Sequence, residues 1–430
     1  MRKNWLLIPL MMVLLFTHSA AQNPPAKPPF MPVTRGEARD GPLGKTRDAP
    51  PGKPRDIKSL PVAAQPIFNS AYLAMQWLKS TNKPDGRFVY GFLPALRAPM
   101  DGDNFVSQAG AAFALSRAAR YFRDERGTAI ARQALLTLLM ETAVDAKDPT
   151  VRHTAAPPIA VNRLASHGLL ILAIHELADP RKATDLLDQA DQLSNYLRRL
   201  QREDGSLIAC EGDTTKRPAM QEIDAHCAGL ALHALMVSQK HRAADWKLAM
   251  TRKALGYYYG TWKTNKNVLT VVSHTPAYAE AYLRTGDAAF AEAVFAMNDW
   301  LIGLQYREEE NSSRKHWLGG FQRYTGGKTE LAIPDIGSAL HAESLAEACR
   351  VARRVGDLPR LQRYERALLL DLHFLMTLQY TLMNTEHFVE PFRPAILGGF
   401  HGSHQDGDLR LDYTQHPLCA MVQYLETVIE

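Results

Sequence analysis

The stretch "YLRRLQREDGSLIA", residues 196–209, decides the fold, because in it a helix with helical apolar spacing ends in a D-G turn. The same plan occurs in "WLKSTNKPDGRF" (77–88), in "WLIGLQY…HWLGGFQ" (300–322) and in "LMTLQY…GGFHGS" (375–403). A second helix, rich in Ala and Leu, follows each of them. A unit that recurs along a chain predicts a repeat protein, in which each copy buries its apolar face against its neighbours.

Placing this unit along the chain predicts six helix pairs. The second helix of each pair is more uniformly apolar than the first, and such a helix must be surrounded by protein. We therefore predict an all-α fold, an (α/α)6 toroid of six helical hairpins with six inner helices ringed by six outer ones. An open superhelical solenoid is the alternative. The predicted pairs are 65–123, 128–179, 182–241, 245–286, 288–356 and 358–429.

The N-terminal end has the pattern of an exported protein. Two basic residues precede the apolar run Trp5–Phe16, and small residues follow it, which predicts a cleaved signal peptide at residues 1–21. An uncleaved N-terminal anchor is the alternative. Residues 22–62 contain ten prolines, eight Lys or Arg and four Asp or Glu, a composition that predicts a basic, disordered linker. The toroid domain then covers residues 63–430, and we expect it in the periplasm or outside the cell.

The positive charge of the chain belongs to its N-terminal end. The whole sequence has a formal charge of +5, but the signal peptide contributes +2 and the linker +4, so the domain carries about −1. We therefore expect no nucleic-acid partner. No later apolar run approaches the roughly 20 residues of a membrane span, so none is expected in the mature protein. The four cysteines lack C-x-x-C spacing, and Cys210–Cys227 is the pair to consider for a disulfide.

Polar residues gather where each inner helix is predicted to begin. In a toroid these beginnings share one rim, and the free N–H groups of helix N-termini suit anionic or polyhydroxyl ligands. Pro417 is typical of a first helical turn, so we expect residues 412–416 to lie in the approach to the last helix. Helix capping is the alternative role for each single acid. The residues predicted to bind substrate are Asp103, Arg163, His167, Glu222, His226, His274, Asp335 and Arg410.

The C-terminal stretch "GGFHGSHQDGDLRLDYTQHPL", residues 398–418, holds three histidines and three aspartates within sixteen residues. Two carboxylates on either side of a glycosidic bond would support hydrolysis. A base such as Tyr413, His416 or His341, with an arginine to neutralise a sugar carboxylate, would support proton abstraction from a uronate. The predicted catalytic residues are Asp224, His341, Asp412, Tyr413 and His416.

No cofactor and no metal is predicted. His401 and His404, with the aspartates that follow them, have metal-ligating side chains, so a metal in this loop is an alternative. However, the loop is rich in glycine, and the sequence contains no complete zinc or calcium motif. A P-loop and a dinucleotide fingerprint are also absent from the sequence.

The stretch "LQREDGSLIACEGDTTKRPAMQEIDAHCAGLALHAL", residues 200–235, resembles the repeat of squalene/oxidosqualene cyclases and protein prenyltransferases. In those repeats a helix that ends in Q-x-x-D/E-G is joined by a loop to an inner helix, so the resemblance implies an α/α toroid. The chain has no D-x-D-D acid motif, and cyclase chemistry is therefore not implied. "EIDAHC" is similar to the region of prenyltransferase β subunits that holds an Asp and a Cys zinc ligand. Only Asp224, His226 and Cys227 could correspond to these ligands, and no convincing third ligand is identifiable.

The stretch "LRLDYTQHPLCAMVQYL", residues 409–425, is similar to the end of glucuronyl C5-epimerase-type domains. This resemblance implies carbohydrate chemistry that involves Tyr413 and His416. We therefore predict an exported toroid that processes or binds a carbohydrate or another small molecule. Acidic uronate glycans are candidate substrates, and a hydrolase, lyase or epimerase is the favoured class of enzyme. The alternative is a cyclase- or prenyltransferase-like toroid without cyclase chemistry that serves as a binding or structural module.

Overall fold

The computed structural model describes residues 55–427 apart from short gaps at 159, 178–183, 210–220, 308–311 and 391. The predicted signal peptide, most of the predicted linker and Cys210 of the considered disulfide lie outside the described residues. The described residues belong to one compact unit. Arg55 is part of this unit, because its Nε donates to the carbonyl of Tyr121 at 3.0 Å and its guanidinium lies 4.3 Å from the centroid of that ring. The folded domain thus begins earlier in the chain than the predicted boundary at residue 62.

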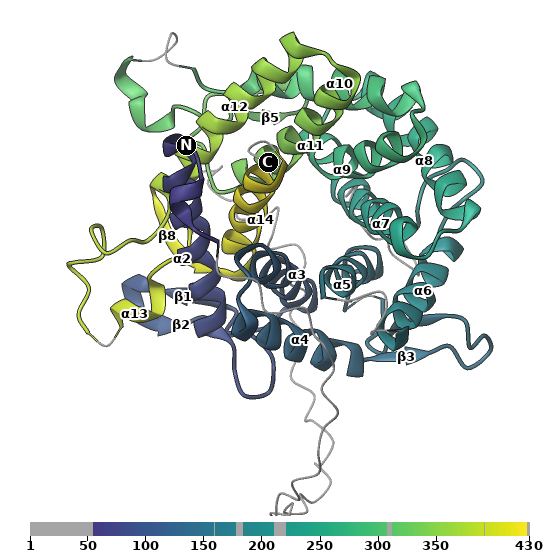
Figure 1. Cartoon of the computed structure of the whole chain (residues 1–430), viewed down its shortest axis with the longest axis horizontal. Coiled ribbons are helices and arrows are strands. Elements are labelled where there is room, and N and C mark those ends of the chain that lie inside the picture. The colour runs from purple at the N-terminus through teal and green to yellow at the C-terminus, as the bar shows by residue number, and fades with distance from the viewer. Residues whose placement is uncertain are drawn as a thin grey trace, which may run out of the picture. The chain divides into compact units, whose positions relative to one another are not determined.

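Six helix pairs form a closed ring (Figure 1). Each inner helix packs against the next, and α14 packs against α3 as well as α11, which closes the ring. The outer helices are α2 (Gln65–Thr81), α4 (Glu125–Met140), α6 (Thr184–Arg199), α8 (Asp245–Thr264), α10 (Ala288–Leu301) and α12 (Leu358–Thr377). The inner helices are α3 (Phe105–Phe122), α5 (Arg163–Leu177), α7 (Gln221–His241), α9 (Val268–Thr285), α11 (Ser338–Val355) and α14 (Leu411–Thr427). The prediction of an (α/α)6 toroid is confirmed.

Burial explains which helix of each pair is the inner one. In α5 every residue from Leu164 to His175 is buried, because the helix packs against α3, α7 and the outer layer. In the neighbouring α6 the buried residues include Leu186, Ala190 and Leu193, the spacing of a helix with one covered face. Among the described helices, none has the length and apolarity required to cross a membrane.

A glutamine follows three of the outer helices and explains the sequence repeat. In each copy its Nε2 donates to the carbonyl of a glycine in the following turn and to a carbonyl of the next outer helix. Asn82, after α2, makes the first of these two bonds, to Gly86. The repeat thus joins neighbouring outer helices through buried or part-buried hydrogen bonds. The bonds run from Gln201 to Gly205 (3.3 Å) and Met250 (2.9 Å), from Gln305 to Gly319 (2.9 Å) and Ala367 (2.8 Å), and from Gln379 to Gly398 (2.9 Å) and Ser70 (3.0 Å).

The glycine of each turn is required by its backbone and by its neighbours. Gly398 and Gly319 both have φ of +92°, a conformation that side chains rarely adopt. A Cβ added at Gly398 would overlap the carbonyl oxygen of Leu73, and one added at Gly319 would overlap that of Leu370. The glycines of the repeat therefore serve the packing of the ring.

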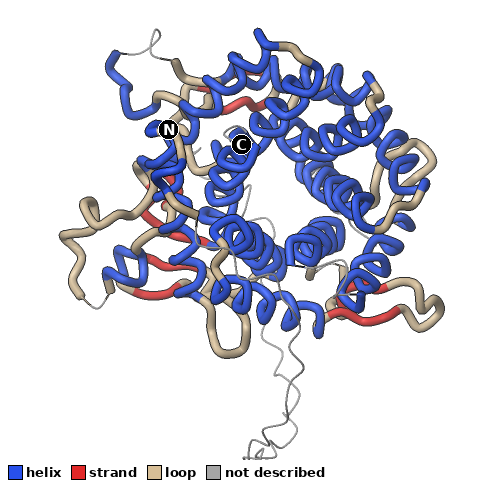
Figure 2. The backbone as a smooth tube through the Cα atoms, viewed as in Figure 1, coloured by secondary structure: helices blue, strands red, loops and turns tan. Residues whose placement is uncertain are grey.

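The two ends of the ring differ in their connections. Short turns such as 123–124 and 356–357 lead from inner to outer helices. The connections from outer to inner helices are long, except the one between α8 and α9, and they lie at the end of the ring where the inner helices begin, here called the rim. Figure 2 shows that the strands of the described residues belong to these long connections. They also contain the short helix α13 (Arg393–Ile396) and the 3-10 helices 94–96, 302–304 and 312–317, while two more 3-10 helices, 57–59 and 62–64, precede α2.

Three small antiparallel sheets brace the rim. A four-stranded sheet in the order β2-β1-β8-β7 joins the first and last helix pairs. Its strands are β1 (Gly91–Leu93), β2 (Ala98–Pro99), β7 (His401–Ser403) and β8 (Asp406–Arg410). The two hairpins are formed by β3 (Thr142–Val144) with β4 (Arg152–Thr154), and by β5 (Arg323–Thr325) with β6 (Lys328–Glu330).

The last inner helix begins directly after β8. The N–H of Leu411, its first residue, donates to the carbonyl of Tyr90 at 3.0 Å, so the sheet fixes where the helix starts. Residues 412–416 therefore lie on the first two turns of α14, and the expectation that they precede the helix is wrong. Pro417 lies inside α14, where its ring removes one backbone donor but its fixed φ still suits a helix.

Candidate functional site

An imidazole–carboxylate pair joins α11 and α14 on their second turns. His416 Nδ1 lies 2.8 Å from Glu343 Oε1. Burial alone would lower the pKa of His416, but the hydrogen bond and charge of Glu343, together with the charge of Asp412, outweigh burial and raise it. A raised pKa stabilises the protonated imidazole, the form that is able to donate a proton.

A second histidine approaches His416 from α7. Burial, and then the positive charge of His416, lower the pKa of His226 to about 4. The Nδ1 of His226 is buried and has no hydrogen-bond partner among the described residues. The two imidazoles line the same cavity. The pKa values of the two imidazoles are thus shifted in opposite directions, which makes His416 the better proton donor and favours the neutral form of His226.

The cavity between these histidines runs along the axis of the ring. All six inner helices contribute to its wall. The polar groups come mainly from α7, α11 and α14, whereas Phe113 of α3 and Leu169 and Leu172 of α5 make an apolar side. Its volume is about 30 Å³, which is room for about two water molecules. A sugar ring is much larger than this volume.

Tyr413 lies one turn nearer the rim, against a guanidinium. The Arg410 guanidinium carbon is 4.9 Å from the centroid of the Tyr413 ring and 5.7 Å from that of Tyr90. Arg410 also donates to both carboxylate oxygens of Asp412, at 3.2 and 3.3 Å. Burial raises the pKa of Tyr413, the charge of Arg410 opposes the rise, and the charge of Asp412 adds to it. The phenol is therefore protonated at neutral pH and is a hydrogen-bond donor.

Further carboxyl groups lie beside Tyr413. The charges of Asp406 and Asp335 also raise the pKa of Tyr413, so both are near it. Asp335 precedes α11; burial raises its pKa, against the hydrogen bond it accepts from a backbone N–H and the charge of Arg323. Burial and the charge of Asp406 likewise raise the pKa of Asp408. Carboxyl groups with raised pKa are able to act as proton donors, so the rim offers acids besides His416.

An ion-pair network that the sequence analysis did not single out lies further from the rim. Arg350 binds Glu347 at 2.6 Å and Glu280 at 2.8 Å, and Gln423 donates to Glu347. Burial raises the pKa of Glu347, although Arg350 opposes this. Glu343 and Glu347 are four residues apart, so helical spacing could have placed both on one face of α11. The network gives the cavity a charged lower wall.

Three of the predicted substrate-binding residues contact neighbouring elements and do not line the axial cavity. Arg163 Nη1 donates to the hydroxyl of Tyr196 of α6 at 2.7 Å. His167 Nε2 accepts from a backbone N–H of β4 at 3.2 Å, and His274 Nε2 lies 2.9 Å from a backbone carbonyl of α7. Burial lowers the pKa of both histidines to about 3, so both are neutral. Because these side chains hold elements together, we do not carry them into the proposed site.

The other predicted residues lie on rim segments of several pairs. Asp103 precedes α3 and pairs with Arg87 at 2.5 Å. Glu222 and Asp224 lie on the first turn of α7, where Glu222 is exposed and Asp224 half-buried. The ring of His341, on the first turn of α11, stacks on a phenylalanine with centroids 4.2 Å apart, and burial lowers its pKa to about 4. The ring fold thus brings residues of distant sequence to one end of the ring.

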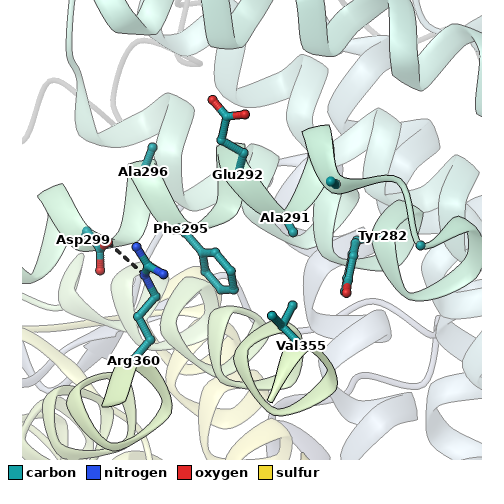
Figure 3. Close-up of a pocket in the computed structure, with 10 residues that line it drawn as sticks. Tyr282, Ala291, Glu292, Phe295, Ala296, Asp299, Val355 and Arg360 are labelled. Carbon is teal, nitrogen blue, oxygen red and sulfur yellow. Dashed lines mark hydrogen bonds and ion pairs between the residues drawn. The ribbon is translucent and has the colours of Figure 1, made fainter. Parts of the chain in front are cut away.

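A second hollow lies at the opposite end of the ring, between α10 and the turn from α11 to α12 (Figure 3). It is an open groove of about 510 Å³, and Phe295 and Val355 form part of its floor. Arg360 lies over the Phe295 ring at 4.6 Å and pairs with Asp299 at 3.0 Å. The groove lacks the pair of opposed imidazoles found on the axis, and we do not assign the reaction to it.

The glycine-rich loop at the C-terminal end of the rim was the alternative place for a metal. His401 Nδ1 lies 2.8 Å from the carbonyl of Ser403, and His404 Nε2 lies 3.2 Å from the hydroxyl of Thr377. Within the described ranges, His, Cys, Asp and Glu side chains form no group of three or more that could hold a metal ion.

The sequence matches no protein-family model and no curated protein. Several solved structures share the fold. A D-mannose isomerase has a TM-score of 0.60 at 12% identity, over 85% of this chain and 99% of that one. An unsaturated glucuronyl hydrolase from Bacillus sp. GL1 has a TM-score of 0.58 at 13% identity, over 85% and 97% of the two chains. The α-1,6-mannanase GH76A from Salegentibacter sp. HEL1_6 has a TM-score of 0.58 at 10% identity, over 83% and 98%.

At these identities the likeness establishes the fold of this chain, an (α/α)6 toroid. The resemblance to cyclase and prenyltransferase repeats led to the same fold, and a closer relation to those enzymes stays a hypothesis. A variant of the mannanase in which two adjacent aspartates are replaced by asparagine is inactive. The present chain contains no two adjacent aspartates.

Proposed function

We propose that the protein is a carbohydrate-active enzyme that moves protons on a sugar bound at the rim, with acidic uronate glycans as the substrate class. The observation that carries the proposal is the pair of imidazoles on one cavity, with the pKa of His416 raised and that of His226 lowered to about 4. Proton abstraction and return require one group that accepts a proton beside another that donates one.

The step can be written for a uronate ring. His226 in its neutral form takes the proton from the carbon next to the carboxylate, and the electron pair of the broken C–H bond moves into the carboxyl group. Arg410 and the Tyr413 phenol stabilise the charge that develops there. In epimerisation the pair returns to the ring carbon, which takes the proton of His416 on its opposite face and is inverted. In elimination the pair forms a double bond to the neighbouring carbon as the bond from that carbon to the glycosidic oxygen breaks, and His416 gives its proton to the oxygen. Epimerisation and elimination therefore share their first half.

The structural neighbours support a carbohydrate as the ligand. By name they are an isomerase of mannose, a glucuronyl hydrolase and a mannanase, and each covers most of this chain. Since this chain lacks adjacent aspartates, the proposal does not take over the chemistry of the mannanase.

Hydrolysis is a second candidate, because carboxyl groups with raised pKa lie beside Tyr413. Asp335 is the candidate acid, since burial raises its pKa, and Asp412 is the candidate second carboxylate. The products separate the reactions: elimination gives an unsaturated sugar that absorbs ultraviolet light, epimerisation exchanges a carbon-bound hydrogen with solvent deuterium, and hydrolysis does neither.

We also propose that the domain acts outside the cytoplasm. The support is the sequence of residues 1–21, which has the pattern of a signal peptide, and of residues 22–62, which has that of a linker. N-terminal sequencing of the mature protein, recovered from a bacterial expression host, would locate the cleavage site. A mature chain that still begins at Met1 would contradict this proposal.

Turnover of defined glycans tests the function. The purified chain is incubated with oligomers of galacturonate, alginate and glucuronate and with neutral mannan, and products are followed by the three readouts above. We expect turnover of at least one uronate. His416→Asn and His226→Gln should each lower kcat by about 10²- to 10⁴-fold. His373→Asn, on the exposed face of α12, is the matched control and should retain wild-type activity.

The outcome separates the enzyme from its alternatives. Uronate binding without turnover in the wild type would favour a binding module. Turnover that survives both histidine substitutions would remove the two imidazoles from the mechanism, and loss of activity in His373→Asn as well would point to a general effect of altering histidines.

A further inference from the structure

A strip of aromatic rings lies on the outer wall of the rim, where α8 and α10 end. Tyr259 and Trp262, near the end of α8, have ring centroids 6.1 Å apart and planes within 16° of parallel. Trp300, near the end of α10, stands edge-on to Trp262 at 5.7 Å, and Tyr324 of β5 stands edge-on to Trp300 at 5.0 Å. Trp262 is buried, and the other three rings are half-buried. We call these four residues the rim aromatic strip.

Two lysines accompany the rim aromatic strip. Lys263 Nζ lies 4.8 Å from the centroid of Tyr259, and Lys266 Nζ lies 5.5 Å from that of Trp262. Both lysines are exposed, and within the described part of the chain neither has a carboxylate at ion-pair distance. Glu292 is near enough to raise the pKa of Tyr259 slightly, after burial. The strip therefore combines aromatic rings with two lysines that form no ion pair with any described residue.

The rim aromatic strip leads toward the proposed site. Tyr324 follows Arg323 in β5, and the charge of Arg323 opposes the raised pKa of Asp335, so these two side chains are close. The charge of Asp335 in turn raises the pKa of Tyr413. Tyr324 and Asp335 thus belong to the same rim connection, the one between α10 and α11.

We propose that the rim aromatic strip binds the further rings of an extended anionic glycan, while its reacting ring lies at Tyr413 and His416. This inference rests on the proposed function and assigns a length and a charge to its substrate. Pyranose rings have apolar faces that pack on Trp and Tyr side chains. Lys263, Lys266 and Arg323 are placed to bind the carboxylates or sulfates that such rings carry. A neutral glycan would pack on the aromatic rings of the strip but would form no ion pair with its lysines.

Binding to matched oligosaccharides tests the strip. Isothermal titration calorimetry of the full chain compares a galacturonate hexamer, a sulfated dextran hexamer and a neutral mannan hexamer. Lys263→Gln with Lys266→Gln should weaken binding of an anionic hexamer about fivefold to tenfold and leave the neutral one unchanged. Lys58→Gln with Lys240→Gln removes the same charge from exposed positions outside the strip and is the control. Trp300→Ala should weaken binding of every hexamer that binds, by about tenfold.

The outcomes separate the strip from the catalytic proposal. Turnover of the shortest substrate should be unchanged in the lysine variant, because that substrate does not reach α8. The inference is overturned if the wild type binds anionic and neutral hexamers with equal affinity. It is also overturned if the two lysine double variants lose affinity for the anionic hexamer equally. Preference for carboxylate or for sulfate identifies the anion, and either supports the inference. If anionic hexamers bind through the strip but no substrate is turned over, the inference about the strip is supported and the catalytic proposal is overturned.

Discussion

At the scale of single residues, the environment of a histidine decides what it can do. The domain contains neutral histidines that hold elements together, such as His167 and His274, and one whose pKa is raised by a carboxylate, His416. The residue type is the same in all of them. The contact with Glu343, 73 positions away in the chain, makes the difference.

Glu343→Gln should change the pH dependence of the reaction. The substitution removes the charge that raises the pKa of His416, and burial, which lowers it, then prevails. Since His416 is proposed to act in its protonated form, the alkaline limb of kcat/KM should move to lower pH by about one unit. The pH profile of kcat/KM measures this shift, and Glu390→Gln on an exposed loop is the control. An unmoved alkaline limb would mean that another group sets it.

A single buried acid on the outer layer offers a stability test. Asp371 of α12 is fully buried, and neither of its carboxylate oxygens has a hydrogen-bond partner among the described residues. Burial raises its pKa well above 3.8. The folded state therefore holds a proton that the unfolded state releases, so this residue costs stability as the pH rises above about 4.

Asp371→Asn should raise the stability of the domain at neutral pH by about 1–3 kcal/mol, because an amide needs no proton to become neutral. The gain should shrink as the pH falls and disappear below about pH 3, where the wild-type carboxyl is protonated in both states. Urea unfolding at several pH values measures both effects, with exposed Asp101→Asn as the control. A gain of the same size at every pH would contradict titration of Asp371 as the cause.

At the scale of elements, the glutamine of the repeat joins neighbouring outer helices by hydrogen bonds. The Nε2 of Gln379 donates to the carbonyls of Ser70 and Gly398, and its Oε1 accepts from the hydroxyl of Ser70 at 2.7 Å. These bonds join the last outer helix to the first. Their loss would leave several buried polar groups without partners.

Gln379→Leu should lower the free energy of unfolding by about 2–4 kcal/mol, since two buried carbonyls lose their donor. The equivalent change at Gln305 should have a similar effect, because it makes the same two kinds of bond. Thermal and urea unfolding measure the loss, and Gln362→Leu on the exposed face of α12 is the matched control. A loss at Gln379 no greater than at Gln362 would show that the repeat does not tie the helices.

The sequence predicted the helices well but misplaced the start of the last inner helix, α14. The Gln and Gly letters of the repeat, with the contrast of apolar and amphipathic helices, were enough to predict six hairpins in a toroid. The start of α14 could not be predicted, because it is set by a strand pairing between Gly91 and Arg410 that no local pattern reveals. For the same reason the sequence placed polar residues at one rim but could not tell that His167 points outward and His226 to the axis.

At the scale of the whole molecule, buried neutral histidines distributed around the ring make its stability depend on pH. Burial lowers the pKa values of His167, His175 and His274 to about 3. In the unfolded chain these groups titrate near 6.5. The unfolded state therefore binds more protons below pH 6.5, and the folded state loses stability as the pH falls from there toward 3.

We expect the midpoint of thermal unfolding to be highest above pH 6.5 and to fall steadily below it. Each such histidine contributes up to about 1.4 kcal/mol per pH unit in this range. Differential scanning calorimetry across pH 4–8 measures the trend. His274→Gln should flatten the curve even if it lowers stability at pH 7. A wild-type curve that is level between pH 7 and 5 would contradict neutral burial of these groups.

The bond between Gln379 and Ser70 spans 309 positions of the chain. Contacts of such long range form late in folding, because the ends of a long loop must first meet. Arg410, Tyr413 and His416 are synthesised last among the helix pairs, so a growing chain cannot assemble the proposed site until nearly all of it has been made. A ribosome that stops one hairpin early would release an arc with an uncovered apolar edge, which quality-control proteases would recognise before any sugar could bind.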